Sequence, residues 1–173
     1  MRISVKDLAS AAVVGAAYAA LTMLLAPISF GLVQFRASEA LCILPAFLPA
    51  ASWGLWVGCA LVNFMSGYGI PDIVFGSFAT LMASLCIARI ARGRSPLLGW
   101  GRCLAVCAMP VLWNGPIVGG VIAWSTGAFW AAFPLNAAQI AVEEAAVMIA
   151  LGLPLLRLLP RSRAFVGALS HVR

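Results

Sequence analysis

The chain is built around apolar runs whose length is close to what a lipid bilayer requires. A membrane-spanning helix needs about 20 predominantly apolar residues. Four stretches approach or exceed that length: residues 8–26, 73–88, 104–124 and 135–156. A fifth apolar stretch, residues 40–65, is interrupted by Pro45, Pro49 and Gly54. Only 9% of the residues are charged, against about a quarter in an average soluble domain, so a soluble globular protein is excluded.

Basic residues indicate which ends of these runs face the cytoplasm. Ten of the 11 lysines and arginines fall at three places: before the first run, between the runs at 73–88 and 104–124, and after the last run. They are Arg2, Lys6, Arg89, Arg92, Arg94, Arg102, Arg157, Arg161, Arg163 and Arg173. The positive-inside rule assigns all three places to the cytoplasm. The net charge of +6 therefore reports topology and does not indicate a nucleic-acid partner.

This charge distribution requires an even number of crossings between the N-terminus and the loop at 89–102. Residues 40–65 are therefore predicted to form two helical segments that turn near Ser52, Trp53 and Gly54. The predicted fold class is an all-α integral membrane protein, a six-helix transmembrane bundle in one domain (1–173) with both termini in the cytoplasm. The helices are expected at about residues 7–27, 37–52, 54–68, 71–91, 103–124 and 134–157.

We set aside the ten cytoplasmic basic residues and Asp7, which lies at the inner end of the first helix. Five charged residues then remain. They come from separate stretches but are all expected in the outer half of the bundle: Arg36, Glu39, Asp72, Glu143 and Glu144. A charged side chain at the bilayer centre costs about 2.5–3.5 kcal/mol on insertion scales, so two glutamates about two turns into the last helix need a reason. The functional interpretation is an outward-facing polar pocket. The structural alternative is a pair with Arg36 that only holds the bundle together.

Amide and aromatic side chains extend this polar region. Gln139 and Glu143 are four residues apart and share a helix face. Glu143 and Glu144 point about 100° apart on a helix, so only one of them is expected to face a small site. In the fifth helix, Trp113 and Asn114 precede a proline that frees a backbone carbonyl group, although a plain kink explains this motif equally well.

Several chemistries lack their residues in this sequence. There is no GxxxxGK[ST] phosphate-binding loop, so ATP hydrolysis is not expected in this chain. The single histidine, His171, lies in the tail, and Cys103 and Cys107 lack local histidine or aspartate partners for a metal ion. We therefore expect no enzyme activity, no cofactor and no metal site.

Small residues recur at every fourth position on two faces of the first helix. One row is Ala12, Ala16 and Ala20, and the adjoining row is Ala11, Gly15 and Ala19. Such rows let another helix approach closely. The spacing alone leaves open whether that helix belongs to the same chain or to another protein.

Three segments of the chain resemble the QueT family of membrane transport proteins. They are residues 30–41, with the run Gln34-Phe35-Arg36-Ala37-Ser38-Glu39; the set Leu44-Pro45, Gly54-Leu55, Gly58 and Asn63; and residues 72–81. The similarity continues through Asn114 and into residues 152–155, and so covers most of the chain. The family carries Gly-Glu where this chain has Glu143-Glu144, so the family glutamate corresponds to Glu144.

This resemblance implies a substrate-binding S component of an energy-coupling factor (ECF) importer in the plasma membrane of a prokaryote. Such a component captures a queuosine precursor from outside and associates with a transmembrane coupling subunit and two ATPase subunits. It then topples in the membrane to release the ligand inside. In this family group an alanine row on the first helix docks on the coupling subunit, a role implied here for Ala12, Ala16 and Ala20.

The implied ligand is a deazaguanine base, in the aminomethyl or cyano form, or queuine or queuosine. Its N–H donors suit a carboxylate, its carbonyl group suits an Arg, Gln or Asn donor, and its flat face suits an aromatic ring. The expected substrate-binding residues are Gln34, Phe35, Arg36, Glu39, Asp72, Trp113, Asn114, Gln139, Glu143 and Glu144.

Three other functions remain open at this point. The chain could be an S component for another vitamin-like or nucleobase ligand. It could be a structural or assembly subunit whose polar residues only stabilise the bundle. It could also be a stand-alone proton-coupled carrier, in which Glu143 and Glu144 would form the proton relay.

Overall fold

Helices make up the fold, with no strand in the residues that the structure describes. The computed structural model describes residues 4–30, 35–93 and 97–172, with side chains to residue 170. The α-helices are α1 (Val5–Leu24), α2 (Ala26–Ser29), α3 (Ala51–Asn63), α4 (Ser77–Ala91), α5 (Trp100–Ser125), α6 (Phe129–Val147), α7 (Leu153–Leu158) and α8 (Arg163–Val172). The described residues also form two 3-10 helices, η1 (Ala37–Ala46) and η4 (Leu159–Arg161). Two π-helical turns are present as well, η2 (Asp72–Gly76) and η3 (Met148–Gly152).

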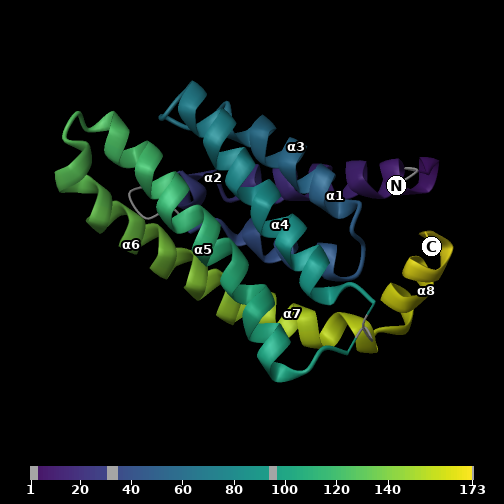
Figure 1. Ribbon diagram of the computed structural model, residues 1–173. Helices are drawn as coiled ribbons and strands as arrows, with labels where there is room; N and C mark the ends of the chain where they lie inside the picture. Colours follow the sequence, from purple (N-terminus) through teal and green to yellow (C-terminus); the bar gives the residue numbers. More distant parts are fainter. Residues whose placement is uncertain (1–3, 31–34, 94–96, 173) are drawn as a thin grey trace.

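Three of these helices are long and apolar enough to cross a membrane. They are Val5–Leu24, Asp72–Ala91 (η2 continued by α4) and Trp100–Ser125. Helices α5 and α6 run antiparallel at one side of the molecule, α1 and α3 pack together at the other, and α4 lies against both α3 and α5 (Figure 1). The start of α1 and helix α8 lie at the same end of the molecule (Figure 1).

The last long helix begins earlier than predicted. We expected it at about 134–157, but α6 starts at Phe129 and includes Pro134 in its second turn, where the proline removes one hydrogen bond of the helix. The helix then continues without interruption through η3 and α7 to Leu158. The π-helical turn η3 is a local change of winding within this run.

Residues 40–65 form two helical segments, but the turn between them lies at residues 47–50 rather than near Ser52, Trp53 and Gly54. Two prolines explain the earlier position. Pro45 and Pro49 both lack the N–H that would continue an α-helix, and the first segment is wound as the 3-10 helix η1. Ser52, Trp53 and Gly54 instead lie in the first turn of α3, which ends at Asn63 rather than near residue 68.

Helices α1 and α3 touch through their backbones. A Cβ atom built on Gly54 would lie 1.9 Å from the Ala11 carbonyl oxygen, and one built on Gly58 would lie 2.6 Å from the Gly15 carbonyl oxygen. The row Ala11 and Gly15 is therefore an internal packing surface. It continues along α1 as Tyr18 and Thr22, both of which are buried.

The second small-residue row points away from the bundle. Ala12, Ala16 and Ala20 are all exposed on α1. The two rows that the sequence left ambiguous are thus distinct in the structure: one packs on α3, and the described part of the chain leaves the other uncovered.

Candidate ligand-binding site

A small enclosed cavity lies among η1, η2, α4, α5 and α6. Its volume is about 20 Å³, close to the space that one water molecule requires. Eight residues line it: Arg36, Glu39, Gly76, Thr80, Asn114, Val118, Ile140 and Glu144. Four of the ten predicted site residues, Arg36, Glu39, Asn114 and Glu144, therefore come together here from three separate parts of the sequence.

The winding of η1 aligns the residues that approach the cavity from this segment. In a 3-10 helix the side chains at i and i+3 eclipse one another. Arg36 at the start of η1, Glu39 and Cys42 follow that spacing, so they form one row. The Cys42 thiol donates a hydrogen bond to Glu39 Oε2 at 3.1 Å, which is the contact this alignment favours.

Glu39 is tied to helix α1 by a buried hydrogen-bond network. The Tyr18 hydroxyl donates to Glu39 Oε1, so both carboxylate oxygens of Glu39 have a donor within the chain. One turn further along α1, the hydroxyl oxygens of Thr22 and Ser38 lie 2.6 Å apart. These contacts fix the position of Glu39 at the cavity relative to α1.

Sequence reasoning did not identify Tyr18. The signal was present, because residues 11, 15, 18 and 22 follow the i, i+4, i+7 spacing of one helix face. A tyrosine on a face of small residues packed against another helix needs a partner for its hydroxyl group. The spacing of small residues alone predicts a packing row that continues through Ala19, which is half-buried.

Asn114 and Glu144 form the second half of the site. Asn114 Nδ2 donates to Glu144 Oε1 at 2.7 Å. The other oxygen of each side chain, Asn114 Oδ1 and Glu144 Oε2, is buried and has no hydrogen-bond partner among the described residues. A buried acceptor without a donor costs about 1–3 kcal/mol, so this pair is suited to a ligand that brings N–H groups.

Arg36 brings positive charge and hydrogen-bond donors to the same cavity. Its guanidinium carbon lies 5.6 Å from the centre of the Phe30 ring, within the range of a cation–π contact. Its Nη1 lies 3.7 Å from Cys59 Sγ, and Thr80 Oγ1 lies 3.4 Å from the same sulfur. The residues that line the cavity therefore include a donor-rich cation and two side chains that each carry an unpartnered buried oxygen.

The other predicted residues in the described part of the chain do not line the cavity. Asp72 is buried, its backbone carbonyl accepts from Asn63 Nδ2 at 2.9 Å, and a Cβ on Gly76 would lie 2.5 Å from Asp72 Oδ1. Asp72 thus sits directly behind the wall that Gly76 forms. Phe35 and Trp113 are half-buried outside the lining, and Gln34 lies outside the described residues.

Glu143 and Glu144 have different surroundings. Gln139 Nε2 donates to Glu143 Oε1 at 2.9 Å, as the shared helix face predicts. Glu144 faces the cavity. The two glutamates also lie deeper than the two turns expected, because α6 starts at Phe129: fifteen residues at 1.5 Å each place Glu144 about 22 Å along the helix.

Apolar helices around a small cavity that combines an arginine, a carboxylate and an amide are typical of a membrane protein with a functional polar site. Comparison with known sequences gives the family. A sequence model of the QueT transporter family matches residues 8–161, and the chain belongs to this family. Family membership confirms the prediction of a transporter rather than an enzyme.

A curated relative carries a related name. It is the queuosine precursor transporter QueT of Lactococcus lactis subsp. cremoris, which is 36% identical over 78 residues. The alignment covers 44% of this chain and 46% of the relative, so the chain matches less than half of the relative's length. No solved structure matches the chain.

Proposed function

We propose that this chain is the membrane-embedded substrate-binding component of an ECF-type importer and that it captures a queuosine precursor. Family membership and the name of the L. lactis relative support this class of ligand. The observation that carries the proposal is the pair of unpartnered buried oxygens, Asn114 Oδ1 and Glu144 Oε2, beside Arg36.

A deazaguanine complements this arrangement. Its amino group and ring N–H form a row of donors, which a carboxylate and an amide oxygen can accept, and its ring carbonyl is an acceptor for a guanidinium. Analogues without those donors would leave the two oxygens buried and unpaired, which is a strong source of specificity. The cavity of about 20 Å³ must widen to admit a base, since small-molecule pockets usually measure about 300–1,000 Å³.

The proposed partners are a transmembrane coupling subunit and two ATPase subunits. The exposed row Ala12, Ala16 and Ala20 supports docking through α1, because none of the described residues buries it. An apolar groove of about 390 Å³ runs beside Ala12 and Ala16, between α1 and α3. A helix of the coupling subunit would approach closely along such a surface.

The proposed topology is six crossings of a prokaryotic plasma membrane with both termini in the cytoplasm. The start of α1 and helix α8 lie at the same end of the molecule (Figure 1), as an even number of crossings requires. The three long helices would supply three crossings. The segment η1, helix α3 and the continuous run α6–η3–α7 would supply one crossing each.

Direct binding to the purified chain tests the proposed ligand. Calorimetric titration with 7-aminomethyl- and 7-cyano-7-deazaguanine, queuine and queuosine should reveal one-to-one binding of at least one of them. The variant Glu144→Gln should weaken that binding by about 10- to 100-fold, because a hydrogen bond to a charged group contributes about 1.5–3 kcal/mol.

Glu143→Gln is the matched control. It makes the same replacement of a carboxylate by an amide at the adjacent residue, and Glu143 does not line the cavity. It should bind within about threefold of the unmodified chain. Failure of the chain to bind any purine-like base would refute the proposed ligand class. Equal losses in the two variants would refute the assignment of Glu144 to the site.

A further inference from the structure

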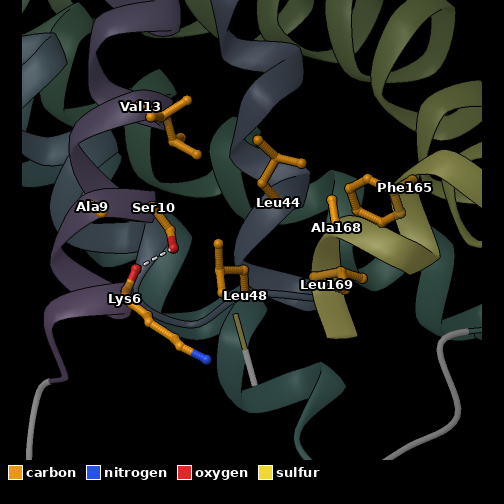
Figure 2. Close-up of a pocket in the computed structure, with 10 residues that line it drawn as sticks. Lys6, Ala9, Ser10, Val13, Leu44, Leu48, Phe165, Ala168 and Leu169 are labelled. Atoms are coloured by element: carbon orange, nitrogen blue, oxygen red, sulfur yellow. Dashed lines mark hydrogen bonds between the residues drawn. The ribbon is translucent and has the colours of Figure 1, made fainter. Parts of the chain in front are cut away.

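A second, larger groove opens between α1 and α8 (Figure 2), at the end of the molecule where the start of α1 and helix α8 lie (Figure 1). Its volume is about 500 Å³. Helix α1 supplies Ala9 and Val13 to one wall, α8 supplies Phe165 and Leu169 to the other, and Leu48 lies between them (Figure 2). The groove is separate from the polar cavity, with which it shares no lining residue.

Lys6 provides a positive charge at one end of this groove. Its side chain is exposed, and its amine lies at the lower end of the groove in Figure 2. Ser10, which also lines the groove, donates its hydroxyl to the Lys6 carbonyl oxygen. The neighbouring Asp7 carboxylate accepts from the Ser4 backbone and hydroxyl. The groove therefore presents apolar walls that end at a lysine ammonium group.

Helix α8 has the character of a helix that lies at a membrane surface. Its apolar residues Phe165, Val166 and Leu169 are spaced to fall toward one side, and exposed Arg161 and Arg163 stand at its start. Such basic, amphipathic helices bind the interface of membranes that contain anionic lipids.

Helix α8 contacts the bundle through an aromatic pair. The Phe165 ring meets the ring of Phe47 edge to face, with centroids 5.4 Å apart. Another groove, of about 620 Å³ and bordered by Arg92, runs along a neighbouring face of α8, and Leu169 lines both grooves. Helix α8 therefore borders two grooves, and it follows the segment 8–161 that matches the family.

We propose that the groove between α1 and α8 binds one anionic phospholipid, with an acyl chain along the apolar walls and the phosphate at Lys6. The apolar walls match an acyl chain, and the single amine at the end matches a phosphate. A small soluble anion would leave those walls unused. A lipid with a net negative charge gains more from Lys6 than a zwitterionic lipid, whose own cation competes for the phosphate.

Native mass spectrometry of the full chain in mild detergent tests this site. Dioleoylphosphatidylglycerol and dioleoylphosphatidylcholine are added in equal amounts, and the fractions of protein carrying each lipid are compared. One basic residue near a membrane favours an anionic lipid by about fivefold. The unmodified chain should therefore retain phosphatidylglycerol with roughly that preference.

Three variants localise the effect. Lys6→Gln should bring the ratio of the two lipids close to one, whereas Lys6→Arg should keep the preference. Arg102→Gln is the matched control, because Arg102 is an exposed basic residue that does not line the groove, and it should leave the ratio unchanged. Ala9→Leu, which narrows the groove at an exposed position, should lower retention of both lipids by severalfold.

Three results would overturn the proposal. The unmodified chain could show no preference between the two lipids, or Arg102→Gln could lower the preference as much as Lys6→Gln does. A second copy of the chain could also displace the lipid. A thermal melt of each variant keeps the comparison interpretable, since these exposed substitutions should change the melting temperature by no more than about 2 °C. None of these measurements depends on deazaguanine binding, so the two proposals stand or fall separately.

Discussion

The backbone contact between α1 and α3 makes Gly54→Ala a sharp test of how this bundle is packed. The added Cβ would lie 1.9 Å from the Ala11 carbonyl oxygen, whereas real Cβ atoms keep at least 3.0 Å from such an atom. Helix α3 must therefore move away from α1 by about 1.1 Å. The atom that would have to give way is backbone rather than the end of a flexible side chain, so no rotamer change relieves the clash.

The expected loss follows from two opposing effects. Overpacking of a tight contact destabilises the folded chain by about 1–3 kcal/mol. Replacing a glycine by alanine also stabilises it by about 0.4–1 kcal/mol, because the unfolded chain has less conformational freedom to lose. The net free energy of unfolding should therefore fall by about 1–2 kcal/mol. For a chain of this length that corresponds to a melting temperature lower by about 2–8 °C.

Thermal unfolding of the purified chain in detergent, followed by circular dichroism, measures this shift. Gly101→Ala in α5 is the matched control, because nothing lies within 4 Å of its added Cβ atom. It should leave the melting temperature unchanged or raise it slightly. If the Gly54→Ala and Gly101→Ala variants melt together, α1 and α3 are not in backbone contact and the packing argument is refuted.

Two further predictions concern the opposite faces of α1. Tyr18→Phe removes the donor to a buried oxygen of Glu39 and should lower the free energy of unfolding by about 1–3 kcal/mol. Tyr68→Phe is the control and should not lower it. Equal melting temperatures of the two variants would contradict the hydrogen-bond network around Glu39. Ala16→Leu, on the exposed row, should leave thermal stability unchanged but reduce co-purification with the coupling subunit by at least severalfold. Undiminished co-purification would contradict docking through this row.

The sequence predicted most where a single physical requirement dominates. Uninterrupted apolar length is enough to predict α1, α4 and α5, because a bilayer admits few alternatives to a helix. Scarcity of charge likewise directs attention to Arg36 and Glu144, since each charge buried in an apolar bundle needs a structural or functional reason. These features depend on residue type and not on how the helices are rotated.

The sequence predicted less where rotation or winding decides the outcome. Glu143 and Glu144 are equivalent by composition, and only the orientation of α6 directs Glu144 to the cavity and leaves Glu143 with Gln139. The hydroxyl of Tyr18 was overlooked because a row of small residues is usually a packing surface. Helix α8 was not predicted, because ten residues after a proline form too short a segment for an apolar-length criterion.

The 3-10 winding of η1 has a consequence for how Glu39 is held. Three residues turn through about 360° in a 3-10 helix but only about 300° in an α-helix. Rewinding the segment from Arg36 to Glu39 as α-helix would swing Glu39 out of the row by about 60° and shorten the segment by about 1.5 Å. Such a change of winding breaks no covalent bond, but it would take Glu39 away from its hydrogen-bond donors Tyr18 and Cys42. The direction in which the Glu39 carboxylate points is thus set by the pitch of one short helix as much as by the residue itself.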